Sequence, residues 1–573
     1  MKLNKIKILI VGLVLTLPFA CSEDFLEVTP NGSLDSTVLA TADGVNSLLI
    51  GAYAMVDGVS GNGFGWAAAS SNWVYGSIRG LEANKGTDSG DQPDINPIQT
   101  YSETATNPYL ENKWGAIYEG ISRVNEALKV LAVAEGNGDI AADLATSFRL
   151  QARALRGYYH LEAWRMWEMI PYIDENTDLT TVTNQDDVRG NILADLEAAT
   201  ALPNTMDQIG RFNGTVARVL YAKALMQMNK DYNKAMSELA TVVSSGTAPD
   251  GSAIGLEARY GDIFDAANRN GVEAIYTVQY SVNDGSGGWN GGWGEVLNFP
   301  YKPNDGSPGG CCGFFQPSFD LVNSFLTDGG LPMLDGSYND NPVANDQGIT
   351  AADPFTADTR PLDPRVDWTA GRRSIEYLDW GPHTGQDWIR DQSYAGPYSP
   401  KKQVYKRSQQ GQLTEVGSWT SGWTTNGYRL IRYADVLLLL AECQIETGNL
   451  GGALDNINAV RNRAANPDGF VKDADGNNAA NYEIAPYPSF NDADHARAAL
   501  RMERKLELGM EGHRYFDLQR WGAVQSELNR VLGYEATELS ALYGSANVGA
   551  EDVNYPIPQN QIDLMGGRLV QNR

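Results

Sequence analysis

Two long blocks of the chain repeat apolar residues at the spacing of amphipathic helices, and this pattern limits the possible folds more than any other feature. In residues 35–245 and 428–533, apolar side chains recur at steps of three and four, which places them on one face of a helix. The sequence therefore predicts a mainly α protein.

Within these blocks, some helices come in short pairs. In segment 434–464, one helix is expected to end at Gly448 and the next to begin near Leu450, because glycine favours the left-handed conformation that ends a helix. Segment 222–239 has the same plan. Such pairs resemble tetratricopeptide hairpins, so we expect helical pairs stacked as a partial solenoid.

Residues 246–425, between the two blocks, have a different composition. They are rich in Gly, Pro, Asp, Asn and Ser and contain only short strand-like runs, such as 274–280. Long irregular segments in a folded protein are more often functional than idle. We expect a large irregular loop-rich region with few short strands.

The first residues resemble an export signal. Three lysines precede the apolar run 8–17, which is too short to span a bilayer. A small alanine then stands directly before Cys21, as at the sites where bacterial lipoproteins are acylated. We predict a signal peptide over 1–20 and lipid attachment at Cys21; an ordinary signal peptide followed by an accidental cysteine is the alternative.

The charge balance excludes several classes of partner. The chain has 71 Asp and Glu against 44 Lys and Arg, a net charge of −27. Nucleic acid is not an expected partner, because phosphates need clustered basic side chains. The same charge disfavours a protein that lies flat on an anionic lipid surface.

No motif for catalysis, a metal or a cofactor occurs. The sequence lacks a nucleophile elbow, a dinucleotide-binding glycine motif, a phosphate-binding loop and the usual zinc spacings. Asp473 and Asp475 begin like a calcium loop, but the expected Gly and Glu are missing at its sixth and twelfth positions, which favours a solvated turn. We therefore predict no catalytic residue, metal or cofactor.

The remaining cysteines allow two interpretations. Cys443 lies in an apolar helical run and is expected to be a small buried hydrophobe. Cys311 and Cys312 are adjacent. They form either a vicinal disulfide, which an exported protein allows, or two packed thiols, the simpler expectation.

The densest charged cluster lies in residues 501–522. On a helix, its charged side chains fall at steps of three and four and can pair with one another. An acid–base site is one interpretation, but an ion-pair network that locks the last helices together is favoured, since Arg–carboxylate pairs need no substrate. The cluster comprises Glu503, Arg504, Glu507, Glu511 and Arg514.

Tryptophan in the irregular segments is the best sign of a ligand. Nine of the 13 tryptophans lie in Gly-rich or polar segments. A flat aromatic ring suits the C–H face of a pyranose, and nearby amides suit its hydroxyls; rings that cap the core under long loops are the alternative. The candidate ligand-binding residues are Trp66, Asn72, Trp73, Tyr75, Trp289, Asn290 and Trp293, followed by Trp380 and Trp388.

Taken together, the motifs resemble the SusD/RagB family of Bacteroidetes outer-membrane lipoproteins. In the N-terminal half the similar segments are Cys21–Pro30, Trp114–Asn125, Arg149–Tyr159 with Pro171, and Gly210–Lys223. In the C-terminal half they are Arg429–Glu442, Ala453–Ala464, Glu503–Gly522 and Tyr555–Ile562. The resemblance covers essentially the whole chain after the signal peptide.

The resemblance implies a fold and a role. It implies a SusD-like, tetratricopeptide-like helical scaffold with irregular loops, divided into an N-terminal part, 21–285, and a C-terminal part, 286–573. The latter comprises the loop-rich segment 286–427 and the helical segment 428–535. It also implies a non-enzymatic lipoprotein, anchored by lipid in the outer membrane and facing outward, that binds glycan and delivers it to a SusC-like, TonB-dependent β-barrel transporter.

The kind of ligand stays open at this point. The net charge favours a neutral glycan, although Arg372, Arg373 and the basic run 401–407 could form a local basic patch. Capture of oligopeptides within the same architecture is an alternative. A surface glycoside hydrolase and a helical scaffold without a small ligand are further alternatives.

Overall fold

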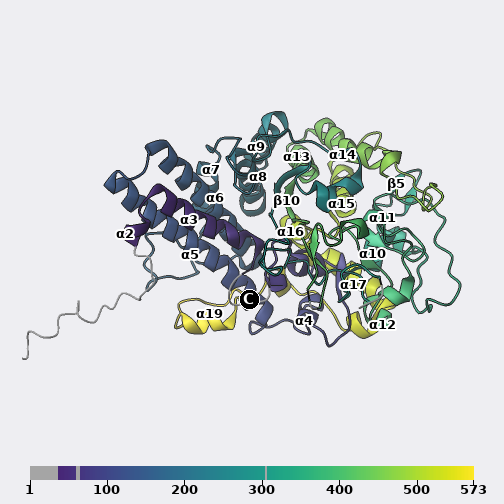
Figure 1. Cartoon of the computed structure of the whole chain (residues 1–573). Coiled ribbons are helices and arrows are strands. Elements are labelled where there is room, and N and C mark those ends of the chain that lie inside the picture. The colour runs from purple at the N-terminus through teal and green to yellow at the C-terminus, as the bar shows by residue number, and fades with distance from the viewer. Residues whose placement is uncertain (1–35, 60–64, 303–305, 418) are drawn as a thin grey trace, which may run out of the picture.

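A computed structural model describes residues 36–59, 65–302, 306–417 and 419–573, and helices dominate it (Figure 1). The predicted signal peptide and Cys21 lie outside the described residues. None of the described helices is long and apolar enough to cross a membrane. The predicted mainly α fold class is confirmed.

Most of the N-terminal helical block forms one end of the molecule, while its short helix Ile95–Gln99 lies apart from the others (Figure 1). There α3 packs against α5, α5 against α6 and α6 against α7. Its helices are α2 Ser36–Leu39, α3 Ala42–Ala54, α4 Ile95–Gln99, α5 Pro108–Asn137, α6 Ala142–Trp167, α7 Arg189–Ala199, α8 Gly214–Ala224 and α9 Tyr232–Ser245.

The C-terminal block supplies the second set of long helices. Its helices are α13 Tyr433–Glu446, α14 Leu450–Ala464, α15 Ala493–Leu508, α16 Arg514–Trp521, α17 Val524–Glu538, α18 Ser540–Tyr543 and α19 Gln559–Leu564. Between the blocks, only the short helices α10 Phe319–Asn323, α11 Val366–Thr369 and α12 Gln392–Ala395 occur in the described residues, besides single helical turns.

The strands are short and pair only two by two. Each pair is antiparallel, and two of the pairs join segments far apart in the sequence. The pairs are β1 Ala83–Gly86 with β3 Phe314–Pro317, β2 Ala274–Thr277 with β10 Arg429–Arg432, β4 Thr327–Asp328 with β5 Leu331–Pro332, β6 Ala370–Gly371 with β7 Ser399–Pro400, and β8 Thr414–Glu415 with β9 Trp423–Thr424.

The predicted helical pair in the C-terminal block is present as α13 and α14. Gly448 turns the chain with a φ of 86°, and the side chain of Asn449 accepts a hydrogen bond from the amide of Gly452 to cap α14. The two helices pack against each other, and α13 also packs against α9. This arrangement matches the predicted hairpins.

One hydrophobic core runs through both blocks, from Ala40 to Leu569. Residues 552–573 close it against the N-terminal helices. The indole of Trp167 donates to the carbonyl of Pro556 (3.1 Å), and Arg573 pairs with Glu103 (2.9 Å). The N-terminal helices therefore complete their packing only with the last segment of the sequence.

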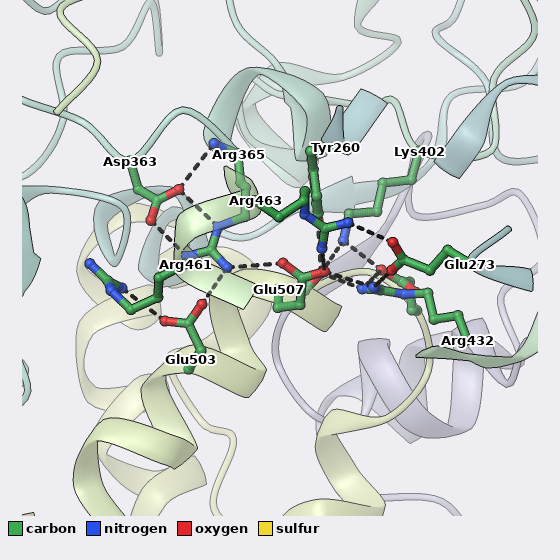
Figure 2. A network of polar contacts seen from close by, with 11 residues as sticks. Tyr260, Glu273, Asp363, Arg365, Lys402, Arg432, Arg461, Arg463, Glu503 and Glu507 are labelled. Atoms are coloured by element: carbon green, nitrogen blue, oxygen red, sulfur yellow. Dashed lines mark hydrogen bonds and ion pairs between the residues drawn. The ribbon is translucent and has the colours of Figure 1, made fainter. Parts of the chain in front are cut away.

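A buried ion-pair network joins α15 to the irregular region (Figure 2). Glu507 on α15 pairs with Arg365 (3.0 Å), with Arg432 at the end of β10 (2.7 Å) and with Arg463 on α14. Burial disfavours ionisation of Glu507, but the three guanidinium groups outweigh it and hold its pKa well below the usual range. Glu507 is therefore ionised in the core.

The network balances its charges. Five cationic side chains face five carboxylates, all almost completely buried. The cations are Arg365, Arg432, Arg461, Arg463 and Lys402, and the carboxylates are Glu273, Asp363, Glu503, Glu507 and Glu511. Unpaired buried charge would cost several kcal/mol, so each partner is needed once the others are present.

The predicted ion-pair network is confirmed, but its expected pairing within one helix is wrong. Glu503 pairs with Arg365 (2.5 Å) and Arg461 (2.8 Å), and Arg504 pairs with Asp435 and Asp517. Because α15 is buried between other elements, its charged side chains find partners on those elements and not along its own face.

The cysteines correct one expectation. Cys443 is buried, as predicted. Cys311 and Cys312 form a disulfide with each other, so the expectation of two packed thiols is wrong.

The calcium-like sequence forms a local turn, because Asp473 accepts hydrogen bonds from the amides of Asp475 and Asn477. The described residues contain no group of His, Cys, Asp and Glu that could hold a metal ion.

Neutralising a single carboxylate of the network is expected to lower the stability of the protein strongly. Glu507→Gln leaves three buried guanidinium groups short of a negative charge, so we expect the free energy of unfolding to fall by about 3–5 kcal/mol. Denaturant unfolding followed by circular dichroism measures this loss. Glu126→Gln, an exposed position on α5, is the matched control and should change stability by less than about 0.5 kcal/mol. Equal stability of the two variants would contradict a network that holds the fold.

Candidate functional site

Five tryptophans from three separate segments meet in one group, which we call the tryptophan cluster. Trp293 lies at its centre: its ring centroid is 4.8 Å from Trp289, 6.3 Å from Trp66 and 5.3 Å from Trp423. Trp419 meets Trp423 edge-on at 5.8 Å. The cluster thus brings together residue 66, residues 289–293 and residues 419–423.

The cluster has a buried base and an exposed rim. Trp66 and Trp423 are buried, with 8% and 7% of their surface exposed. Trp289 and Trp419 are 66% and 40% exposed. Because most large aromatic rings are buried in a folded protein, two exposed indoles supported by three packed ones make this cluster the candidate ligand-binding surface.

Glycines let the loops approach these rings. A Cβ atom at Gly288 would lie 2.6 Å from the ring of Trp423, and one at Gly417 would lie 1.8 Å from it. Gly288 also has a φ of 87°, which disfavours other residues. The indole nitrogen of Trp293 donates to the carbonyl of Gly288 (3.0 Å), which fixes the central ring.

Polar groups lie beside the exposed rim. Asn290, next to Trp289, donates through its side chain to Asp284 (2.8 Å). Hydrogen bonds from Asn290 and Ser286 lower the pKa of Asp284, so this exposed carboxylate is ionised at neutral pH. Glu415 accepts from the amide of Asn283 (2.9 Å), which ties this loop to β8. Hydroxyl groups of a ligand on Trp289 would meet an amide and a carboxylate.

The structure does not bring three of the predicted residues to this surface. Trp73 is 1% exposed and meets Phe314 and Phe315 edge-on. Asn72 is buried and donates to Glu162 (3.0 Å), while the buried hydroxyl of Tyr75 lies 2.7 Å from the carbonyl of Ala67. Asn72, Trp73 and Tyr75 are buried in the core, so their predicted place in a surface binding site is wrong.

Trp380 and Trp388 lie in a second aromatic group. Trp388 is buried beside Tyr377, and the half-buried Trp380 donates to the carbonyl of Tyr405 (3.0 Å). These rings pack under the loop-rich region with Phe299. Among the described residues, no ring contact joins them to the tryptophan cluster.

Most of the suggested basic patch is buried. Arg372 pairs with the buried Asp367 (2.8 Å), and Lys402 pairs with Glu511 (2.7 Å). Lys401 is likewise buried. At the end of the run, Lys406 pairs with Asp265 and Arg407 is exposed, so only this end of the predicted patch reaches the surface.

Trp419 and Trp423 were not among the candidate residues. Their signal in the sequence is a spacing of four within a segment of Gly, Ser and Thr, the same spacing that separates Trp289 from Trp293. Two such pairs in irregular segments would have pointed to a common site.

Buried carboxylates lie next to the cluster. Glu295 follows Trp293 by two residues and is 5% exposed. Burial, together with the charge of Asp57, raises the pKa of Glu295 to about 7. Burial likewise raises the pKa of Asp57 to about 7. Neither forms an ion pair within the described part of the chain.

The raised pKa of Glu295 predicts that the stability of the protein depends on pH. The pKa of Glu295 in the folded state, about 7, lies above its usual value of 4.5, so the folded state holds the proton more tightly and loses stability as the pH rises through this range. Glu295→Gln resembles the protonated acid and escapes that loss. We expect the stability of the variant, relative to that of the wild type, to be higher at pH 8 than at pH 5.

Denaturant unfolding at both pH values measures the difference, with Glu126→Gln as the control for an exposed carboxylate. A difference between wild type and Glu295→Gln that is the same at pH 5 and pH 8 would contradict a raised pKa.

Two cavities of the described residues lie away from the tryptophan cluster. One of about 60 Å³ is lined by α6, α8, α13 and α16 residues such as Glu162 and Asp517. A larger one, about 330 Å³, lies among α15, α16 and α17. Neither cavity is lined by a tryptophan of the cluster.

Comparison with known proteins finds related families for both halves of the chain. The SusD family model matches residues 272–573, and a second family model, described as starch-binding and associating with the outer membrane, matches residues 24–253. SusD-like protein P25 of Formosa agariphila is 21% identical over 95% of this chain and 94% of its own length.

Solved structures share the fold. A laminarin-binding SusD-like protein has a TM-score of 0.65 at 21% identity, over 93% of this chain and 99% of that chain. Surface glycan-binding protein A from Bacteroides thetaiotaomicron, solved with laminarihexaose, has a TM-score of 0.64 at 20% identity with the same coverage.

SusD-like proteins are non-catalytic, which agrees with the prediction of a non-enzymatic protein. The chain belongs to the SusD family.

Proposed function

We propose that this protein is a surface-exposed lipoprotein that captures a glycan on the tryptophan cluster and delivers it to a SusC-like, TonB-dependent outer-membrane transporter. The observation that carries the proposal is the pair of exposed indoles, Trp289 and Trp419, supported by three packed ones. The glycan-binding solved structures and the family models support the same role.

The chemistry of the cluster fits a sugar chain. The exposed indole of Trp289 offers its face to the C–H groups of a pyranose, and Asn290 and Asp284 lie beside it for the hydroxyls. The supporting rings and glycines hold the indole in place before a ligand arrives, which lowers the ordering cost of binding. The ionised Asp284 and the acidic net charge favour a neutral glycan.

Capture and delivery need only modest affinity for a short ligand. An open surface contacts few sugar units, and a transporter beneath the bound lipoprotein would supply a second surface at high effective concentration. Ligand that contacts both partners would then favour the closed complex, because it adds contacts only in that state.

Two single substitutions test the cluster. We expect Trp289→Ala and Trp419→Ala to weaken glycan binding by about tenfold each, because exposed aromatic anchors dominate such interfaces. The measurement is affinity electrophoresis of the form starting at Ser22 in gels that contain laminarin and other plant, fungal and host polysaccharides.

Trp380→Ala is the control, since Trp380 lies in the separate aromatic group and should leave retardation unchanged. If one polymer retards the wild type and both cluster variants equally, the cluster is not the binding surface. If no polymer retards the wild type and peptides bind instead, the protein captures peptides. Release of reducing sugar would contradict the proposal of a non-enzymatic binding protein.

The anchor has its own test. Cys21→Ser removes the thiol that would carry the lipid, so we expect the protein to leave the outer-membrane fraction and become soluble. Fractionation and protease treatment of intact cells check this, with Cys443→Ser as the control at a buried cysteine. A Cys21→Ser variant that still sediments with the outer membrane would contradict lipid attachment at this residue.

A further inference from the structure

The cavity of about 330 Å³ lies between α15, α16 and α17 and the loop after β5. Its apolar walls come from Leu334, Met502, Leu518 and the ring of Trp521. The volume is within the range of sites for small organic ligands. It is not part of the tryptophan cluster, with which it shares no residue.

The cavity is basic, in contrast to the acidic chain around it. Four cationic side chains line it against two carboxylates, which leaves an excess of two positive charges. The cations are Arg501, Lys505, Arg514 and Arg530, and the carboxylates are Asp335 and Glu527.

Three of the four cations have carboxylate partners. Glu527 accepts from Arg514 (2.8 Å) and from Arg530 (2.9 Å). Lys505 pairs with the buried Asp320 (2.5 Å), which lies behind the lining. Two carboxylates, Glu527 and Asp320, thus serve these three cations.

Arg501 is the exception. Within the described parts of the chain no carboxylate forms an ion pair with it; its guanidinium lies over the ring of Trp521, 5.0 Å from the centroid. Burial lowers the pKa of Arg501, the carboxylates of Glu442 and Glu446 raise it, and the charges of Arg497 and Arg514 lower it. Among the described residues both carboxylates pair with other arginines, Glu442 with Arg520 and Glu446 with Arg497. The half-buried guanidinium of Arg501 therefore lies near negative charge without an ion-pair partner of its own.

We propose that this cavity binds a carboxylated sugar of monosaccharide size, with the carboxylate on Arg501. The guanidinium fork matches a carboxylate through two parallel hydrogen bonds. An inorganic anion would leave most of the volume and the apolar walls without a partner, whereas a pyranose ring fills both. The proposal does not depend on the tryptophan cluster and adds a second, anion-selective site to it.

Calorimetric titration at low ionic strength tests the proposal, using the form that starts at Ser22. The probes are glucuronate and galacturonate, with glucose and galactose as neutral sugars of the same size. We expect at least one acid to bind and neither neutral sugar to bind. Added salt should weaken the binding, because a half-buried charge pair remains partly screened.

Two variants locate the binding. Arg501→Gln should weaken it by about tenfold or more. Ala498→Phe keeps every charge but places a ring in the cavity, since Ala498 lies one helical turn before Arg501 and lines it; it should abolish binding. Arg149→Gln on α6 is the control: it makes the same change at a partly exposed side chain that pairs with Glu135 and does not line the cavity.

Each outcome is decisive. Binding of an acid that both cavity variants lose and the control retains supports the site, provided that the variants melt at the temperature of the control. No binding of either acid, equal binding of neutral sugars, or unchanged binding by Arg501→Gln overturns it. Trp289→Ala should bind the acid normally, so a failure of the tryptophan cluster as a glycan surface and a failure of this cavity are distinguishable.

Discussion

The buried carboxylate of Glu507 is the interaction on which most of the architecture depends. Three guanidinium groups from the residue before α11, from β10 and from α14 converge on it. These segments also share hydrophobic cores, but the irregular region between the blocks has few regular elements. A balanced set of charges therefore adds to the apolar packing in specifying how loops sit on helices.

The tryptophan cluster is also built from segments far apart in the sequence. Residue 66 precedes the long N-terminal helices, whereas residues 289–293 and 419–423 lie in the irregular region. Glycines at the contact let the tryptophan rings pack directly against the backbone, and the buried rings support the exposed ones. The proposed binding surface is thus formed by loops, as binding sites on a rigid scaffold commonly are.

The sequence predicted these features to different depths. Helical periodicity predicted both blocks and the hairpin at Gly448, because a helix buries residues at a fixed local spacing. The spacing also showed that Glu503 and Glu507 form ion pairs, but not with which partners, since Arg365 is more than a hundred residues away. Trp289 and Trp293 were predicted at the candidate surface, whereas Trp73 was placed there wrongly: composition cannot tell an exposed ring from one that fills the core under a loop.

The packing of residues 552–573 against the N-terminal helices bears on how the chain is made and exported. Trp167 and Glu103 receive partners from this segment, so the N-terminal block lacks part of its core until the ribosome has passed residue 573. A chain that gains its last core contacts so late remains without a finished domain throughout synthesis. Such a delay would serve the export that the proposed function requires, because a translocation channel accepts an unfolded polypeptide and not a folded one.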